Sequence, residues 1–236
     1  TFLQEQNAYP GLANRTLEKH VDRVFLGFKD AQKYFKNPEK CIETGNPVRK
    51  SFFTLDKEQA RKKLGFKKDD FIVFSFGGSL GAEKINEVAF ELMQVLNGHE
   101  GASMVFGTGK WYYEKMLEKA AERGIEIKEN IRMKDYIEDM ENYLAACDLV
   151  ISRAGALSVA ETTVCGKAAV LIPSPNVTGN HQYFNAKAVA DRRGAVLIEE
   201  KDLTAETLIR EVMKLRNNPQ ILAEMGRASR ACAPDK

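Results

Sequence analysis

Residues 151–161 read ISRAGALSVAE, which joins a strand pattern to a helix pattern through a turn of small residues. The apolar run 149–151 precedes the turn, and residues 158–165 carry helical spacing. Ala154 and its neighbours would let the backbone approach a ligand, and the first helical N–H groups would point at an anion. Glu161 follows about one turn later, where a carboxylate can accept both hydroxyls of a ribose. The stretch fits either a nucleotide-diphosphate site or an ordinary strand–loop–helix connection with a solvated carboxylate.

Apolar strand-like runs alternate with amphipathic helical stretches along most of the chain. The predicted strands cover residues 71–76, 103–106, 130–136, 149–151, 168–172 and 195–198. The predicted helices cover residues 85–96, 111–123, 140–146, 157–165, 181–193 and 205–216. Strands that are apolar throughout and alternate with helices indicate a parallel sheet covered on both faces, a doubly wound Rossmann-like α/β fold. Ligands of such sheets bind beyond the carboxyl ends of the strands.

The segment before these strands has a different pattern. A helix is predicted near residues 12–20 and a strand over 24–28, and Gly45-Asn46-Pro47 reads as a turn. We therefore expect a boundary there, with residues 1–46 ending one domain and residues 47–236 forming another. Because the chain starts without a methionine, in what reads as the middle of a strand, we expect a fragment of a longer protein.

Composition and charge exclude several classes of protein. The 236 residues, 44% of them apolar, can bury the core of one large domain or two small ones. The net charge is only +2, and basic clusters such as Arg61-Lys62-Lys63 read as solvated faces, which argues against a nucleic-acid surface. The four cysteines show no metal-ligand spacing, so we expect neither zinc nor disulfides, and a reducing cytosol. No apolar run approaches the ~20 residues of a membrane-spanning helix.

Two further loops carry polar or glycine-rich sequence after a strand. Residues 74–82 read FSFGGSLGA, in which glycines permit positive φ and a close approach of N–H groups to phosphate oxygens. The loop is neither a P-loop nor G-x-G-x-x-G. Residues 173–182 hold amides and hydroxyls that suit a sugar, or they form a polar connection with Asn180 as N-cap. Two glycine-type turns on one parallel sheet predict a sugar-nucleotide or dinucleotide site.

These motifs together resemble the MurG family of bacterial peptidoglycan glycosyltransferases. That family moves N-acetylglucosamine from UDP-GlcNAc onto undecaprenyl-pyrophosphoryl-MurNAc-pentapeptide, called lipid I, to make lipid II. The matching stretches are EQN at 5–7, PG at 10–11, GNPVR at 45–49, GGSLGA at 77–82, RAGALS at 153–158, NHQ at 180–182 and NA at 185–186. Two positions depart from the pattern, because Gln4 stands where many relatives have histidine and His181 where others have a second glutamine.

The resemblance implies a GT-B fold built from two Rossmann-like domains. By this resemblance, residues 47–236 form the UDP-sugar donor-binding domain, and residues 1–46 are the end of the acceptor-binding N-terminal domain plus the linker. The missing lobe is then expected to carry most of the acceptor site, the membrane-facing surface and the catalytic base. The implied partners are UDP-GlcNAc, lipid I and, peripherally, the cytoplasmic face of the bacterial membrane, with no cofactor, metal or nucleic acid. We expect the fragment alone to bind donor poorly and to be inactive.

The resemblance also assigns donor contacts, residue by residue, and leaves the catalytic residue unknown. Ser79 and the backbone of Ala156, Leu157 and Ser158 are expected to bind the diphosphate and sugar. Glu161 is expected to bind the ribose hydroxyls, and the main chain of Ile137 the uracil. Gln182 is expected to contact the GlcNAc hydroxyls, and Asn7 and Arg49 make further contacts with the donor.

Two other functions fit the same residues. One is another UDP-sugar enzyme of this architecture, such as a UDP-GlcNAc epimerase or a lipid glycosyltransferase. The other is a non-catalytic nucleotide-binding module, which would bind UDP and UDP-GlcNAc with equal affinity. The amide-rich loop at residues 180–182 argues against the module, because a pure nucleotide sensor needs no sugar contacts.

Overall fold

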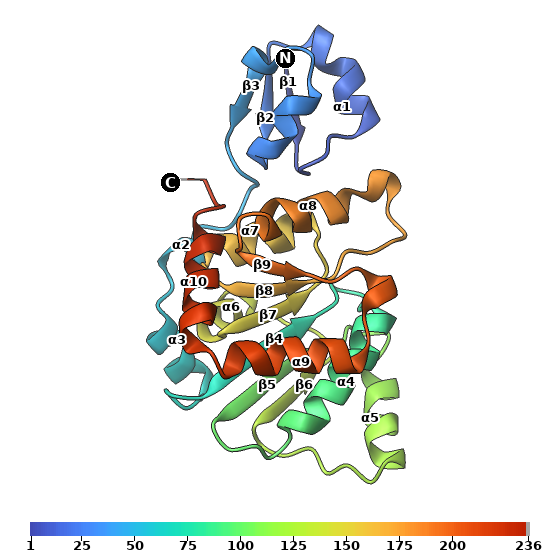
Figure 1. Ribbon diagram of the computed structural model, residues 1–236, viewed down its shortest axis with the longest axis vertical. Helices are drawn as coiled ribbons and strands as arrows, with labels where there is room; N and C mark the ends of the chain where they lie inside the picture. The colour runs from blue at the N-terminus through green and yellow to red at the C-terminus, as the bar shows by residue number, and fades with distance from the viewer. Residues whose placement is uncertain (235–236) are drawn as a thin grey trace.

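The computed structural model describes residues 1–234 and contains two parallel β-sheets (Figure 1). The first sheet has three strands in the order β1-β2-β3 and occurs with one short α-helix and three 3-10 turns. We call residues 1–43 the small unit. Its elements are β1 (Phe2–Glu5), α1 (Leu12–Leu17), η1 (Glu18–His20), β2 (Arg23–Leu26), η2 (Lys29–Tyr34), η3 (Pro38–Lys40) and β3 (Cys41–Glu43).

The second sheet has six parallel strands in the order β6-β5-β4-β7-β8-β9. They are β4 (Phe71–Phe76), β5 (Ala102–Gly107), β6 (Ile131–Lys134), β7 (Leu149–Ser152), β8 (Ala168–Leu171) and β9 (Ala195–Leu197). All six predicted strands form, so the predicted doubly wound parallel sheet is confirmed. This is the strand order of a Rossmann fold, whose ligands bind where the order reverses, here between β4 and β7. We call residues 51–234 the large unit.

Helices cover both faces of the large sheet, because successive side chains of a strand point to opposite sides. In β4, Ile72, Phe74 and Phe76 belong to one core cluster and Val73 to the other. The helices on the Val73 side are α4 (Glu83–Leu96), α5 (Tyr113–Glu122) and α9 (Ala205–Arg216). Those on the other side are α2 (Ser51–Thr54), α6 (Met140–Ala146), α7 (Ala156–Val164) and α8 (His181–Ala190). The last helix, α10 (Pro219–Arg230), packs against β8, α7 and α9.

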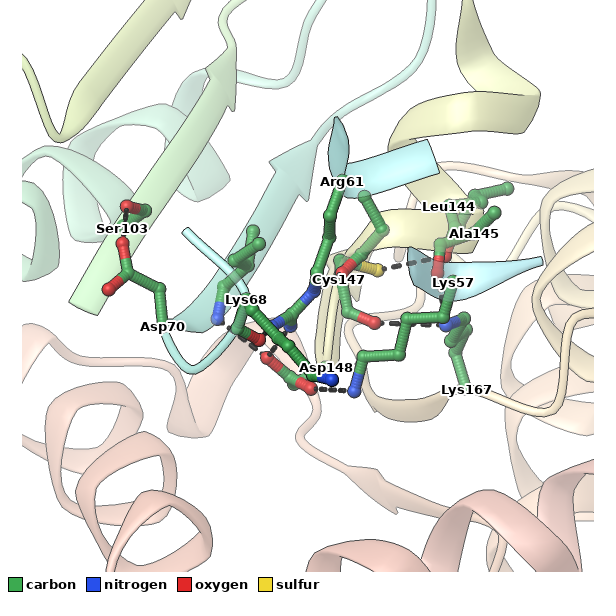
Figure 2. Close-up of polar contacts among 12 residues, drawn as sticks. Lys57, Arg61, Lys68, Asp70, Ser103, Leu144, Ala145, Cys147, Asp148 and Lys167 are labelled. Atoms are coloured by element: carbon green, nitrogen blue, oxygen red, sulfur yellow. Dashed lines mark hydrogen bonds and ion pairs between the residues drawn. The ribbon is translucent and has the colours of Figure 1, made fainter. Parts of the chain in front are cut away.

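Helix α3 (Lys57–Leu64) corrects one expectation about its basic run. Lys62 and Lys63 are exposed, but Arg61 is only 4% exposed and does not lie on a solvated face. Its Nε donates to the Ala146 carbonyl at 3.0 Å, and its Nη2 pairs with Asp148 at 2.7 Å (Figure 2). The long aliphatic stem of an arginine lets the residue be buried while its head finds partners. Arg61 therefore fixes α3 to α6 and to the residue before β7.

A buried thiol and a buried amine lie beside this ion pair at the amino end of β7 (Figure 2). Lys167 donates from Nζ to the carbonyls of Ala145 at 2.7 Å and Cys147 at 3.0 Å. Burial lowers the pKa of Lys167 and raises the pKa of Cys147 to about 12. All four cysteines are free thiols. The cluster is at the opposite end of the strands from the loops that bind ligands in this fold, so we interpret it as structural.

Helix α8 of the large unit faces the small unit (Figure 1). The Phe184 ring stacks on Tyr9 with 4.7 Å between centroids, and Nδ1 of His181 lies 2.8 Å from the Tyr9 carbonyl oxygen. Just past the helix, Arg192 pairs with Asp30 at 3.0 Å. Among residues 1–234, the structure has no helix that is both long and apolar enough to cross a membrane.

Candidate nucleotide-sugar site

A cavity of about 420 Å³ opens at the carboxyl end of the large sheet. It is lined by the last residues of β4 and β5 and the loops after them, by the loop from β6 to the start of α6, by α7, and by Arg49 from the connection between the units. This is the place where a Rossmann sheet binds its ligand. The lining residues are Arg49, Phe76, Gly78, Ser79, Gly107, Gly109, Asp135, Tyr136, Ile137, Glu138, Met140, Ser158 and Glu161.

The loop after β4 has the glycine-dependent geometry that the sequence predicted. Gly78 has φ 98° and Gly81 has φ 86°, both in the left-handed region. A Cβ on Gly81 would clash with the Thr108 carbonyl, whereas one on Gly78 would have no neighbour within 4 Å. The loop is therefore packed tightly on one side and open at Gly78, where it borders the cavity together with Ser79.

Helix α7 brings its first turn to the same cavity. Its N-cap is Gly155, and no side chain caps it, so the first N–H groups lack a partner from within the helix. Such a helix start binds anions through these N–H groups and the helix dipole. The Ser158 side chain lines the cavity, and Leu157 beside it is 44% exposed. Arg153, just before the turn, instead forms an ion pair with Glu200.

Two charged side chains of opposite sign line the cavity near α7. Burial raises the pKa of the Glu161 carboxyl. The positive charge of Arg49 partly offsets this increase, and the negative charge of Glu141 adds to it. Arg49 pairs with Glu141, with 2.8 Å between Nη2 and Oε2, and its guanidinium carbon lies 5.1 Å from the centre of the Phe52 ring. A partly buried carboxylate with a perturbed pKa in a cavity marks a candidate functional group.

The structure brings most of the predicted donor contacts together and leaves two outside the cavity. Arg49, Ser79, Ile137, Ser158 and Glu161 all line it, and Ala156 and Leu157 begin the helix that borders it.

Asn7 and Gln182 are absent from the lining. The Gln182 Oε1 accepts from the Ser174 amide at 2.9 Å, and the Asn7 Oδ1 accepts from Nδ2 of Asn185 at 3.1 Å. Asn180 occupies the N-cap position of α8, but its side chain makes no capping bond.

Asn185 stands in one of the matching motifs, but the sequence alone indicates no role for it. Asn185 is fully buried and connects three segments. Its Oδ1 accepts from the Ala8 amide at 2.8 Å, and its Nδ2 donates to Asn7 and, at 3.1 Å, to the Ala154 carbonyl. A second amide, that of Asn46, donates to the carbonyls of Gln6 at 2.9 Å and Ala156 at 3.4 Å. Both bridges join the loop after β1 to the start of α7.

The loop after β1 is shaped by a carboxylate. Glu5 is 2% exposed, and it accepts from the amides of Asn7 at 2.8 Å and Gly11 at 2.9 Å and from Nδ2 of Asn14 at 2.9 Å. With a further bond from Nδ2 of Asn7 at 3.3 Å, four N–H donors satisfy the buried carboxylate without a cation. The Glu5-Gln6-Asn7 stretch is thereby held against Asn185. Among residues 1–234, no group of three or more His, Cys, Asp or Glu side chains could hold a metal ion.

A family model described as the glycosyltransferase family 28 C-terminal domain matches residues 72–235, which is most of the chain. The chain belongs to glycosyltransferase family 28. The match covers the six-stranded sheet and the residues of the cavity other than Arg49.

Two named proteins are similar to this family 28 chain over almost its whole length. It is 42% identical over 225 residues to the UDP-N-acetylglucosamine–N-acetylmuramyl-(pentapeptide) pyrophosphoryl-undecaprenol N-acetylglucosamine transferase of Thermoanaerobacter sp. (strain X514), covering 95% of this chain and 61% of that protein. The crystal structure of Acinetobacter baumannii MurG matches with a TM-score of 0.75 at 27% identity, covering 98% of this chain and 62% of that one. The chain thus spans about 61% of the length of the first relative.

The structural likeness to MurG confirms the predicted GT-B type of Rossmann-like fold. The UDP complex of Staphylococcus aureus MnaA also matches, with a TM-score of 0.66 at 15% identity over 96% of this chain and 60% of that one. At that identity the likeness shows the fold alone.

Proposed function

We propose that this family 28 chain is the donor-binding part of an enzyme that transfers N-acetylglucosamine from UDP-GlcNAc to lipid I, forming lipid II for peptidoglycan. The observation that carries the proposal is the cavity between β4 and β7, where an uncapped helix start, a glycine loop and Glu161 meet. The name of the 42% identical relative, a transferase of N-acetylglucosamine from its UDP donor, supports it.

In this proposal the residues around the cavity divide the donor among them. The diphosphate lies at the N–H groups that open α7 and beside Ser79, where the helix dipole favours negative charge. Glu161 accepts the ribose hydroxyls, and the main chain of Ile137 contacts the uracil. Gln182 and Asn7 do not line the cavity. We assign Gln182 to the GlcNAc hydroxyls and Asn7 to a further contact with the donor.

The chemistry that suits this site is direct displacement with inversion at the anomeric carbon. A hydroxyl of the acceptor sugar attacks that carbon as the bond to the diphosphate oxygen breaks, and UDP leaves with the electron pair. Arg49 and the α7 dipole stabilise the negative charge that develops on UDP. A base removes the proton of the attacking hydroxyl, and we assign no residue of this chain to that step. The displacement exchanges one C–O bond for another, so we propose no cofactor.

We further propose that residues 1–46 belong to the acceptor side of the enzyme and that residues 47–236 form the donor domain. The two separate parallel sheets support this division, because β1 to β3 form one sheet and β4 to β9 form the other. The acceptor is a lipid, which places the whole enzyme peripherally on the cytoplasmic face of the membrane.

Calorimetric titration of the chain with UDP-GlcNAc, UDP-glucose and UDP tests the donor site. We expect UDP-GlcNAc to bind in preference to UDP-glucose. We expect Glu161→Ala to weaken all three ligands by about 10-fold or more, because the variant loses charge-assisted hydrogen bonds to the ribose. The matched control is Glu138→Ala, which removes an exposed carboxylate from the same cavity. Equal binding by the Glu161→Ala variant and the wild type would contradict the ribose assignment.

Product analysis separates the transferase from its alternatives. An epimerase would release a sugar isomer from UDP-GlcNAc without any lipid acceptor, whereas the transferase yields lipid II only when lipid I is present. A nucleotide-binding module would bind UDP and UDP-GlcNAc with equal affinity and form neither product. For turnover the assay uses the full-length protein that contains this chain.

A further inference from the structure

The cavity has more acidic than basic side chains, although its proposed ligand is an anion. Among the described residues that line it, Arg49 carries the one basic side chain, whereas Asp135, Glu138 and Glu161 carry carboxylates. Arg49 is therefore the cation of the cavity lining that can pair with a diphosphate at the start of α7. The affinity for the nucleotide then depends on which group Arg49 pairs with before the nucleotide binds.

That partner is Glu141, from the first turn of α6. The two side chains meet in parallel, with 2.8 Å between Nη2 and Oε2 and 3.5 Å between Nη1 and Oε1. The guanidinium also lies over the Phe52 ring at 5.1 Å. Glu141 is the more enclosed partner, with 20% of its side chain exposed against 59% for Arg49. A carboxylate thus holds the arginine at the rim of the cavity, while more than half of the arginine side chain stays exposed to solvent.

We propose that Glu141 competes with the nucleotide for Arg49: the guanidinium is bound to Glu141 in the free protein and transfers to the diphosphate when UDP or UDP-GlcNAc binds. This inference rests on the proposed function, because it takes the cavity to be the donor site. Binding breaks the ion pair and leaves the Glu141 carboxylate next to a new anion. Departure of UDP restores the pair, so Glu141 lowers affinity for the nucleotide and favours release of UDP after transfer.

The size of the effect follows from the exposure of the pair. Exposed ion pairs contribute little, so their loss changes a binding constant by about two- to five-fold. We expect Glu141→Gln to tighten UDP binding by about that factor, since glutamine keeps the shape and one acceptor but not the charge. Uridine has no phosphate, so its affinity is expected to be unchanged. A variant that merely distorted the cavity would change the affinity for both ligands.

Two controls distinguish the transfer of Arg49 from Glu141 to the diphosphate from a general effect of removing negative charge. Glu138→Gln removes another carboxylate from the same cavity, and the described residues give Glu138 no ion pair, so we expect a smaller gain in UDP affinity. In an Arg49→Ala background, Glu141→Gln is expected to give no tightening beyond that of Glu138→Gln. Thermal unfolding of each variant checks that the fold is intact.

The outcomes separate this inference from the proposed function. If the wild type binds UDP but Glu141→Gln leaves the affinity for UDP unchanged or lowers it, the competition is refuted and the donor site stands. Equal tightening by Glu138→Gln, or full tightening in the Arg49→Ala background, also refutes it, since charge alone then explains the gain. If neither this chain nor the full-length protein that contains it binds UDP at millimolar concentration, the donor site itself is refuted, and the competition with it.

Discussion

At the scale of single residues, Cys147 has a definite effect on the pH dependence of stability. Burial raises the pKa of its thiol from 9.0 to about 12 in the folded chain. In the unfolded chain the thiol loses its proton above about pH 9, so the folded state then binds more protons and stability falls as pH rises. The stabilising contribution of Cys147 is therefore complete below pH 9 and is lost progressively between pH 9 and pH 12.

We expect the variant Cys147→Ala to lose this dependence. The free energy of unfolding of the wild type should fall relative to that of the variant by about 1.4 kcal/mol between pH 8 and pH 10. Urea unfolding of both proteins at the two pH values measures it, and the difference between them removes the contributions of other titrating groups such as Lys167. A constant difference across this range would show that the thiol is accessible to hydroxide or solvent in the folded protein.

At the scale of helices and strands, local sequence patterns predicted the architecture but not the contacts between residues that lie far apart in the sequence. The strands β4 to β9 are apolar runs, and the loop after β4 needs glycines for its positive φ values, so both could be identified from a few neighbouring letters. Helix α3 reads KEQARKKL and was not predicted, because Ala60 and Leu64 are its only apolar residues and the third contact with the core is the stem of Arg61.

The polar partners within the site could not be predicted for the same reason. Arg49 and Glu141 are separated by 92 residues, and Asn7 and Asn185 by 178. The residues next to Arg49 in the sequence do not indicate that it pairs with a glutamate of α6, and those next to Asn185 do not indicate that it is fully buried. Motif matching placed Asn185 in a family pattern, but only the folded chain shows that its amide bridges two units.

Helix α8 gives an element-scale prediction, because its two faces differ. Asn185 lies on the buried face and makes bonds to Asn7, Ala8 and Ala154, whereas Lys187 is exposed and forms an ion pair with Asp191. Asn185→Ala leaves the Ala8 amide without its partner inside the interface, and we expect a loss of about 1–3 kcal/mol in the free energy of unfolding. Lys187→Ala should change it by less than about 0.5 kcal/mol. Urea unfolding followed by circular dichroism compares them, and equal losses would show that the amide network adds nothing.

At the scale of the whole molecule, the candidate site joins two units of very different size. The cavity belongs to the large unit, while the Asn185 and Asn46 bridges fix the small unit beside the start of α7. A movement of the loop after β1 therefore acts on the backbone at Ala154 and Ala156, next to the proposed diphosphate position. Closing two units over a substrate in this way is a common means of assembling a reaction site and excluding water.

The same difference in size predicts which unit unfolds locally more often. The small unit has one compact core cluster, formed by Val21, Val24, Leu26, Ala31 and Phe35, whereas two much larger clusters flank the large sheet. Local stability follows buried apolar contacts, so amide hydrogen exchange should be faster in β1 to β3 than in β4, β5 and β7. Exchange followed by mass spectrometry measures this peptide by peptide. Asn185→Ala should accelerate exchange further in β1 and its following loop, because those residues lose their anchor on α8, and should leave β4 unchanged. Uniform protection across both sheets would show that the two units unfold as one cooperative body.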